Sequence, residues 1–134
     1  MKKELQKIIE KAILDLFGLE QVDFSVEYPK EEKFGDYATN AALVLAKKVG
    51  KSPMEIADAI KLKVESQKSI EFAKIEVAQP GYVNFFLSEK YLQDRVVKIN
   101  EEKEGFGKSE TGKGLKINNE FISANPTGPL TVGN

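Results

Sequence analysis

Three residues of one short segment are suited to binding a flat, polar partner. Residues 82–87 read Tyr-Val-Asn-Phe-Phe-Leu, a pattern typical of a strand. Because successive side chains of a strand point to opposite faces, Tyr82, Asn84 and Phe86 share one face, and the apolar residues that alternate with them share the other. An unstacked nucleotide base can stack on an aromatic side chain while an amide hydrogen-bonds its edge. The alternative is that helices cover both faces, which would make Asn84 a buried amide with satisfied hydrogen bonds.

A second candidate is the segment SANPTGPLTVGN, residues 123–134. Two prolines, two glycines and two asparagines in twelve residues do not suit a helix or a packed strand, so we expect a loop shaped to hold a ligand. Gly128 and Gly133 would let backbone N–H groups approach a phosphate closely. Glycines in loops also occur as simple turns, and that alternative stays open.

Length and composition limit the chemistry. The 134 residues fit one domain and part of another, and 41% hydrophobic with 31% charged residues is typical of a folded globular chain. The chain has neither cysteine nor histidine, so we expect no disulfide, no metal site and no histidine-based catalysis. No apolar run is long enough for a membrane helix, which favours a cytoplasmic protein. With a net charge of −1, any RNA contact would come from local patches.

The first half predicts two helices and a strand. Apolar residues at steps of three and four predict a helix over residues 5–17 that ends at Gly18. Alternation predicts a strand over residues 24–28. Asp36 is a suitable N-cap for a helix through Val49.

The second half predicts a further helix, a hairpin and a last helix. Ser52 to Glu55 form a capping box with proline at the first helical position. Strands are predicted over residues 70–78 and 82–87, joined by a type II turn at Pro80 and Gly81. Ser88 then caps a helix that extends to Ile99.

The end of the chain reads as the start of another domain. Residues 105–114 are glycine-rich and charged, as in a linker, and residues 115–122 suggest one strand. The overall prediction is an α+β fold: a two-layer domain over residues 1–110, in which helices pack on an antiparallel sheet. Residues 111–134 would be a linker and the truncated start of a Rossmann-type domain.

Four motifs resemble one enzyme family. Residues 120–130, EFISANPTGPL, closely resemble the segment that opens the catalytic domain of arginyl-tRNA synthetases, just before the class I signature His-x-Gly-His. Upstream, GDYATN at 35–40, KSP at 51–53 and PGYVNF at 80–85 follow the order and spacing of that family's amino-terminal additional domain. In the family this domain touches the elbow of tRNA. The resemblance implies that Tyr82 and Asn84, with Phe86 beside them, contact a D-loop base.

The resemblance also implies sites at the end of the chain. Glu120 and Asn125 match positions of the arginine pocket, where a carboxylate suits guanidinium and an amide oxygen suits the substrate ammonium. Ser123 belongs to the same pocket. The ATP-binding loop would include Pro126, Gly128 and Gly133.

The signature departs from the family pattern at two positions. Thr131 and Asn134 stand where the family usually has histidines that help hold ATP phosphates in the adenylation transition state. Both side chains can donate hydrogen bonds, but neither can become cationic. The departure is either a lineage variant in which Asn134 supplies a similar donor, or an inactivation.

Taken with the resemblance, the sequence predicts the tRNA-binding (D-loop and elbow) module of an arginine–tRNA ligase. The expected partner is tRNA(Arg), with arginine and ATP, accompanied by Mg²⁺, as substrates of a monomeric full-length parent. The chain itself is expected to bind no cofactor and to be catalytically inactive, because one strand and one loop cannot assemble an ATP pocket. The alternative is a small protein-interaction domain without RNA binding.

Overall fold

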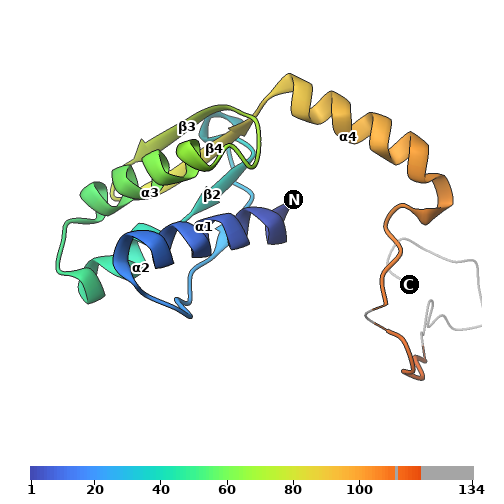
Figure 1. The fold of residues 1–134 in the computed structure, drawn as a ribbon, viewed down its shortest axis with the longest axis horizontal. Helices are drawn as coiled ribbons and strands as arrows, with labels where there is room; N and C mark the ends of the chain where they lie inside the picture. The colour runs from blue at the N-terminus through green and yellow to red at the C-terminus, as the bar shows by residue number, and fades with distance from the viewer. Residues whose placement is uncertain (111, 119–134) are drawn as a thin grey trace, which may run out of the picture. The chain divides into compact units, whose positions relative to one another are not determined.

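The computed structural model describes residues 1–110 and 112–118 (Figure 1). Two compact units are separated after Glu101, and the first, Met1–Glu101, carries a four-stranded sheet with helices. This unit is an α+β fold, as predicted.

The sheet is antiparallel throughout and has the strand order β1-β2-β4-β3. Its members are β1 (Val26–Glu27), β2 (Tyr37–Thr39), β3 (Phe72–Ala78) and β4 (Tyr82–Leu87). Phe85 of the central strand β4 faces Tyr37 on one side and Ile75 on the other. The sheet therefore joins segments that are far apart in the sequence around one fully buried phenylalanine.

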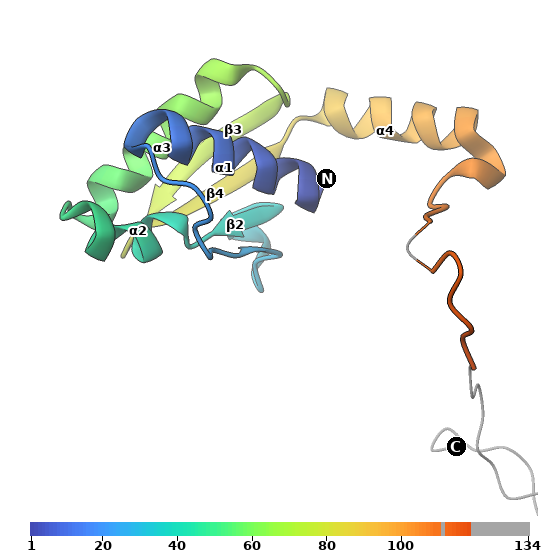
Figure 2. The same cartoon turned by 60° about the horizontal axis from the view of Figure 1, so that its bottom comes forward.

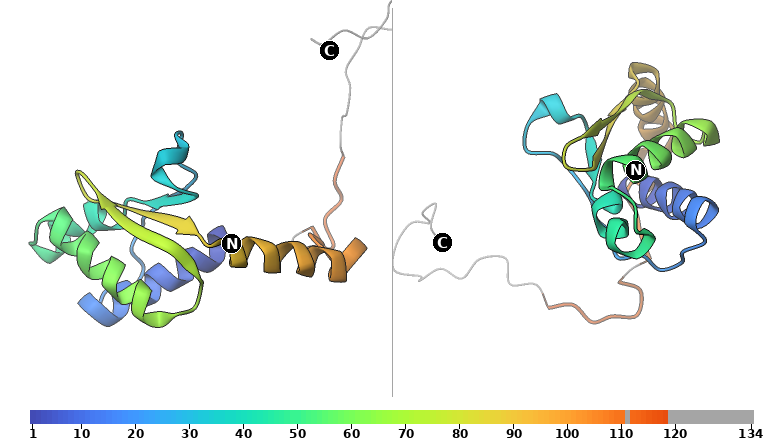
Figure 3. Two further views of the ribbon diagram at one scale, coloured as in Figure 1. Left: turned by 90° about the horizontal axis from the view of Figure 1, so that it is seen from above. Right: turned by 90° about the vertical axis from the view of Figure 1, so that its left-hand side faces the viewer.

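Three helices cover one face of this sheet: α1 (Lys2–Phe17), α2 (Ala41–Val49) and α3 (Pro53–Gln67) (Figures 2 and 3). Each turns a stripe of aliphatic side chains into the core. The buried members are Leu5, Ile8, Ile9, Ala12, Ile13, Ala41, Ala42, Leu45, Ile56, Ala57, Ile60 and Val64. In the right-hand view of Figure 3, the loop around residues 30–35 lies on the opposite side of the sheet from these helices. The two faces of the sheet are thus different environments.

The predicted helix ends are confirmed where local chemistry sets them. The Gly18 N–H donates to the Leu14 carbonyl at 2.8 Å and ends α1. The Ser52 and Glu55 capping box starts α3, and the hydrogen bonds from Ser52 to the Glu55 carboxylate lower the pKa of that carboxyl. Ser88 Oγ accepts from the Tyr91 N–H at 3.1 Å at the start of α4 (Glu89–Glu102).

Asp36 does not cap a helix, so that prediction is wrong. Residues 37–39 form strand β2, and α2 begins only at Ala41, after Asn40. The Asp36 N–H donates to the Phe85 carbonyl at 2.9 Å, and its carboxylate accepts the Leu87 N–H at 2.8 Å. A short acceptor side chain such as that of aspartate suits both an N-cap and a hydrogen bond to a distant strand. Only the fold distinguishes the two roles.

Three further predictions need correction. The first strand is limited to Val26–Glu27. The β3–β4 turn has its hydrogen bond from the Gly81 N–H to the Ala78 carbonyl, with a cis Gln79–Pro80 peptide, which makes it a type VI turn and not type II. Residues 115–118 of the strand predicted over 115–122 are not in a strand, and 119–122 lie outside the described residues.

Gly35 fixes the loop against β4. Its φ is 86°, and a Cβ at this position would lie 2.7 Å from the Phe85 carbonyl oxygen. Only glycine combines this backbone conformation with so close an approach. We call Gly35, Asp36 and their contacts with Phe85 and Leu87 the Gly35–Asp36 clamp.

We expect Gly35→Ala to destabilise the domain more than Gly18→Ala. Gly18 also has a positive φ, of 65°, but no described atom lies within 4 Å of a Cβ built there. Gly18→Ala should therefore cost only about 1–2 kcal/mol of unfolding free energy for the left-handed backbone, whereas Gly35→Ala should add a steric overlap to strain of about 1–3 kcal/mol. Urea unfolding of the two variants measures the difference. Equal losses would show that the clamp does not constrain the loop.

Candidate nucleic-acid interface

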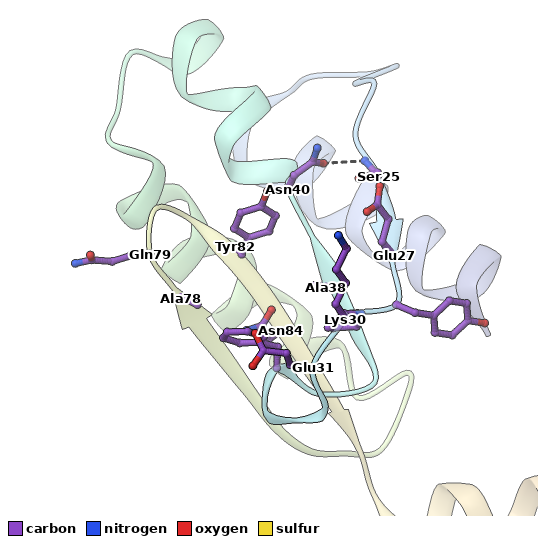
Figure 4. A pocket seen from close by; sticks show the side chains of 13 residues that line it. Ser25, Glu27, Lys30, Glu31, Ala38, Asn40, Ala78, Gln79, Tyr82 and Asn84 are labelled. Carbon is purple, nitrogen blue, oxygen red and sulfur yellow. Dashed lines mark hydrogen bonds between the residues drawn. The ribbon is translucent and has the colours of Figure 1, made fainter.

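The face of the sheet that the helices do not cover contains a hollow of about 400 Å³ (Figure 4). We call it the outer hollow. Strand residues and the loop that follows β1 both line it. The lining includes Glu27, Lys30, Phe34, Asn40, Tyr82 and Asn84. Its volume lies within the usual range for small-ligand sites.

Asn84 lies within this hollow and is almost fully buried, with 4% of its surface exposed. Among the described residues its side-chain amide has no hydrogen-bond partner. The amide atoms keep some contact with solvent, since Gln67 Nε2 is the only fully enclosed side-chain polar atom without a partner in that part of the chain. Ala38 faces it across the sheet from β2 and is too small to cover it. Because the amide reaches the hollow without a partner in the described structure, its donor and acceptor are available to a ligand. Helices do not cover this face of the described sheet, although Asn84 is buried as the alternative expected.

Tyr82 and Phe86 flank Asn84 on the same face of β4, but their surroundings differ. Tyr82 lines the outer hollow and is 41% exposed. The Phe86 ring is half-buried, and Lys74 Nζ lies 4.1 Å from its centroid. Lys74 also pairs with Glu76 at 2.8 Å. Of the two predicted stacking surfaces, Tyr82 is the accessible one in this structure.

Phe34 lines the outer hollow and was not singled out from the sequence. It closes a short 3₁₀ turn, Glu32–Phe34, directly before Gly35, and 38% of its surface is exposed. One signal could have found it: it is the single apolar residue of the charged run from Lys30 to Gly35.

Charges of both signs surround the outer hollow. Glu27 and Lys30 line it, and Figure 4 shows the Lys30 side chain reaching over it from the loop. Within the described part of the chain, neither residue is in an ion pair. Glu31 is paired with Lys33 at 2.7 Å. Among the described residues, the hollow therefore offers the Lys30 ammonium and the Glu27 carboxylate, neither of them in an ion pair, beside the Asn84 amide.

The residues of the motif at 35–40 shape the hollow mainly through their contacts with neighbouring segments. Thr39 Oγ1 donates to the Ser25 carbonyl at 2.7 Å, and Asn40 Oδ1 accepts the Ser25 N–H at 2.8 Å (Figure 4). Tyr37 packs against the Tyr28 ring, and burial together with the Tyr28 hydroxyl raises the pKa of Tyr37. These contacts hold β1 against β2 and so fix one wall of the hollow.

The site residues predicted at the end of the chain lie outside the described residues. They are Glu120, Ser123, Asn125, Pro126, Gly128, Thr131, Gly133 and Asn134. Residues 1–110 and 112–118 contain no cluster of side chains suited to a metal ion. In the same part of the chain, no helix is both long and apolar enough to cross a membrane.

A two-layer α+β domain with one open sheet face is thus the class of protein that the geometry defines. Residues 3–87 match the family model described as the arginyl tRNA synthetase N terminal domain. That match covers the whole sheet and, apart from Lys2, the three helices that pack on it. The chain therefore belongs to the arginyl-tRNA synthetase N-terminal domain family.

Curated relatives share this segment. The chain is 45% identical to an arginine–tRNA ligase of Thermotoga petrophila over 113 residues, which are 84% of this chain and 20% of that protein. It is 38% identical to one of Caldanaerobacter subterraneus over 139 aligned residues, covering 99% of this chain and 25% of that protein. The chain thus spans about a fifth to a quarter of the length of these relatives.

Two solved structures have a similar fold. The arginyl-tRNA synthetase of Plasmodium falciparum aligns with a TM-score of 0.65 and 25% identity, over 73% of this chain and 18% of that one. The arginyl-tRNA synthetase of Thermus thermophilus aligns with a TM-score of 0.57 and 26% identity, over 72% of this chain and 16% of that one. Both support the α+β assignment.

We expect Asn84→Ala to cost little unfolding free energy, at most about 0.5–1 kcal/mol, through lost packing alone. The amide makes no hydrogen bond to lose within the described structure. The matched control is Thr39→Ala on the neighbouring strand, 1% exposed, whose hydroxyl bonds the Ser25 carbonyl; its loss should cost about 1–3 kcal/mol. Chemical denaturation compares the two. A loss for Asn84→Ala as large as that for Thr39→Ala would mean that Asn84 holds the fold together.

Proposed function

We propose that the outer hollow binds an unstacked base of tRNA, with Tyr82 as a stacking surface and Asn84 as the group that hydrogen-bonds the base edge. The observation that carries this proposal is the buried Asn84 amide, which lacks a partner among the described residues and lies beside the exposed Tyr82. Recognition of single-stranded RNA requires a π-face and a polar edge contact side by side.

In the larger protein, we propose that this domain is the module of an arginine–tRNA ligase that binds the D loop and elbow of tRNA(Arg). The relatives that carry this name support the proposal. Arginine and ATP with Mg²⁺ would then be substrates of a monomeric, cytoplasmic parent, with Glu120, Ser123 and Asn125 toward arginine. The loop with Pro126, Gly128 and Gly133 and the signature positions Thr131 and Asn134 would face ATP.

A protein-interaction domain is the second candidate. The feature that favours it is helix α4, on which Leu92, Val96 and Val97 are about half exposed. Such a helix face is suited to a protein partner and not to RNA phosphates. The two candidates therefore place the binding surface on different elements.

We expect tRNA(Arg) to bind the chain at low salt, with log affinity falling linearly as log salt rises, because phosphate contacts release counterions. Tyr82→Ala should weaken binding by about 1–3 kcal/mol through lost stacking, and Asn84→Ala should weaken it further. Fluorescence anisotropy of labelled tRNA across a salt series measures both effects.

The control is Leu62→Ala on α3, which removes a side chain that is 64% exposed on a helix and not part of the outer hollow. It should bind tRNA as the unmodified chain does. Unchanged affinity in a folded Tyr82→Ala/Asn84→Ala double variant would contradict the proposed interface.

A further inference from the structure

Phe34 is an aromatic side chain held at the surface. It is 38% exposed and belongs to the loop on the open face of the sheet, away from the core under the helices. The Gly35–Asp36 clamp keeps this loop in place through the 2.9 Å bond to the Phe85 carbonyl and the 2.8 Å bond from the Leu87 N–H. The Gly35–Asp36 clamp therefore holds the apolar Phe34 ring where it is exposed to solvent.

The position of that ring relates it to Asn84. Phe34 and Asn84 line the outer hollow together, and both also line a second hollow of about 560 Å³ that extends to Lys61 and Glu76. Phe34 therefore stands next to Asn84 where the two hollows meet. Tyr82, two residues before Asn84 on the same face of β4, lines only the first of these hollows.

Charge at the ring favours a polar, flat ligand over an apolar one. Lys33 Nζ lies 4.8 Å from the Phe34 ring centroid and is itself bound to Glu31. Lys30 lines the same hollow and has no ion pair among the described residues. Glu27 lines the hollow as well, so both signs of charge are present, and the ammonium of Lys30 beside the aromatic ring is suited to a base and its phosphate.

We propose that Phe34 is the second aromatic wall of the base site, opposite Tyr82, so that the base whose edge meets Asn84 is enclosed from two sides. Phe34 thereby has the role in base contact that the sequence pattern gave to Phe86. This inference rests on the proposed function, because it assigns a further residue to the same RNA site. It also gives the glycine of the clamp a role in binding, since Gly35 sets the position of Phe34.

The test compares aromatic and aliphatic replacements in the full 134-residue chain, with an unmodified tRNA(Arg) transcript at low salt. Phe34→Tyr should bind near the unmodified affinity. Phe34→Leu keeps the apolar bulk but loses the π-face, and should bind roughly 5- to 150-fold more weakly, as expected for one lost stacking contact. Thermal melting of both variants checks that they are folded. If Phe34→Leu binds as the unmodified chain does, Phe34 acts through packing and the inference is wrong.

A spectroscopic readout separates stacking from indirect effects. The chain contains no tryptophan, so Phe34→Trp introduces a single tryptophan, which can be excited selectively over the four tyrosines. We expect tRNA to quench its fluorescence, and to leave that of the matched control Leu62→Trp, on exposed α3, unchanged. Equal responses of the two reporters would overturn the inference.

The proposed function can fail separately. If Tyr82→Ala weakens binding but the Phe34 variants do not, only the inference about Phe34 is refuted. If the unmodified chain binds no tRNA at low salt, the RNA interface itself is refuted and the role of Phe34 with it.

Discussion

The contact of the Gly35–Asp36 clamp with strand β4 is the constraint on which the rest of the domain depends. Two hydrogen bonds, from the Asp36 N–H to the Phe85 carbonyl and from the Leu87 N–H to the Asp36 carboxylate, join segments about fifty residues apart in the sequence. They place β2 beside β4 and start the register that pairs Ala38 with Asn84. Without glycine at position 35, the loop could not approach the Phe85 carbonyl so closely. The sheet, the loop on its open face and the hollow between them all follow from this contact.

The two faces of the sheet differ: one holds the core, and the other holds the proposed binding site. On the covered face, Val83 and Phe85 are fully buried beneath aliphatic helix stripes, and apolar burial there holds the fold together. On the open face, Asn84 lies recessed without a partner among the described residues, and Tyr82 and Phe34 stay exposed. A polar side chain that reaches a hollow without a partner in the described structure is typical of binding sites.

The sequence was sufficient wherever local chemistry decides. Residue types and their spacing predicted helix α1 and the capping box of α3. They also placed Tyr82 and Asn84 on one face of β4. Strand β2 was missed because three residues carry little periodicity, and their pairing partners are distant. Asp36 was misassigned for the same reason: its acceptor is suited to an N-cap, and its real partner is 51 residues away. Phe34 could not be placed, because a loop residue takes its position from tertiary contacts. The predicted sites beyond residue 118 lie outside the described residues and stay predictions.

The most direct measurement is the NMR response of the Asn84 side-chain amide to tRNA(Arg). In a ¹⁵N-labelled chain at low salt, the account predicts that the two Asn84 side-chain NH₂ resonances shift on titration, because the base edge supplies the hydrogen bonds that no described residue provides. Backbone amides of residues 82–86 and 33–35 should shift with them, while those of α1 should not. Shifts confined to α1, or to α4 with the Asn84 resonances unmoved, would contradict an RNA interface on the open face of the sheet.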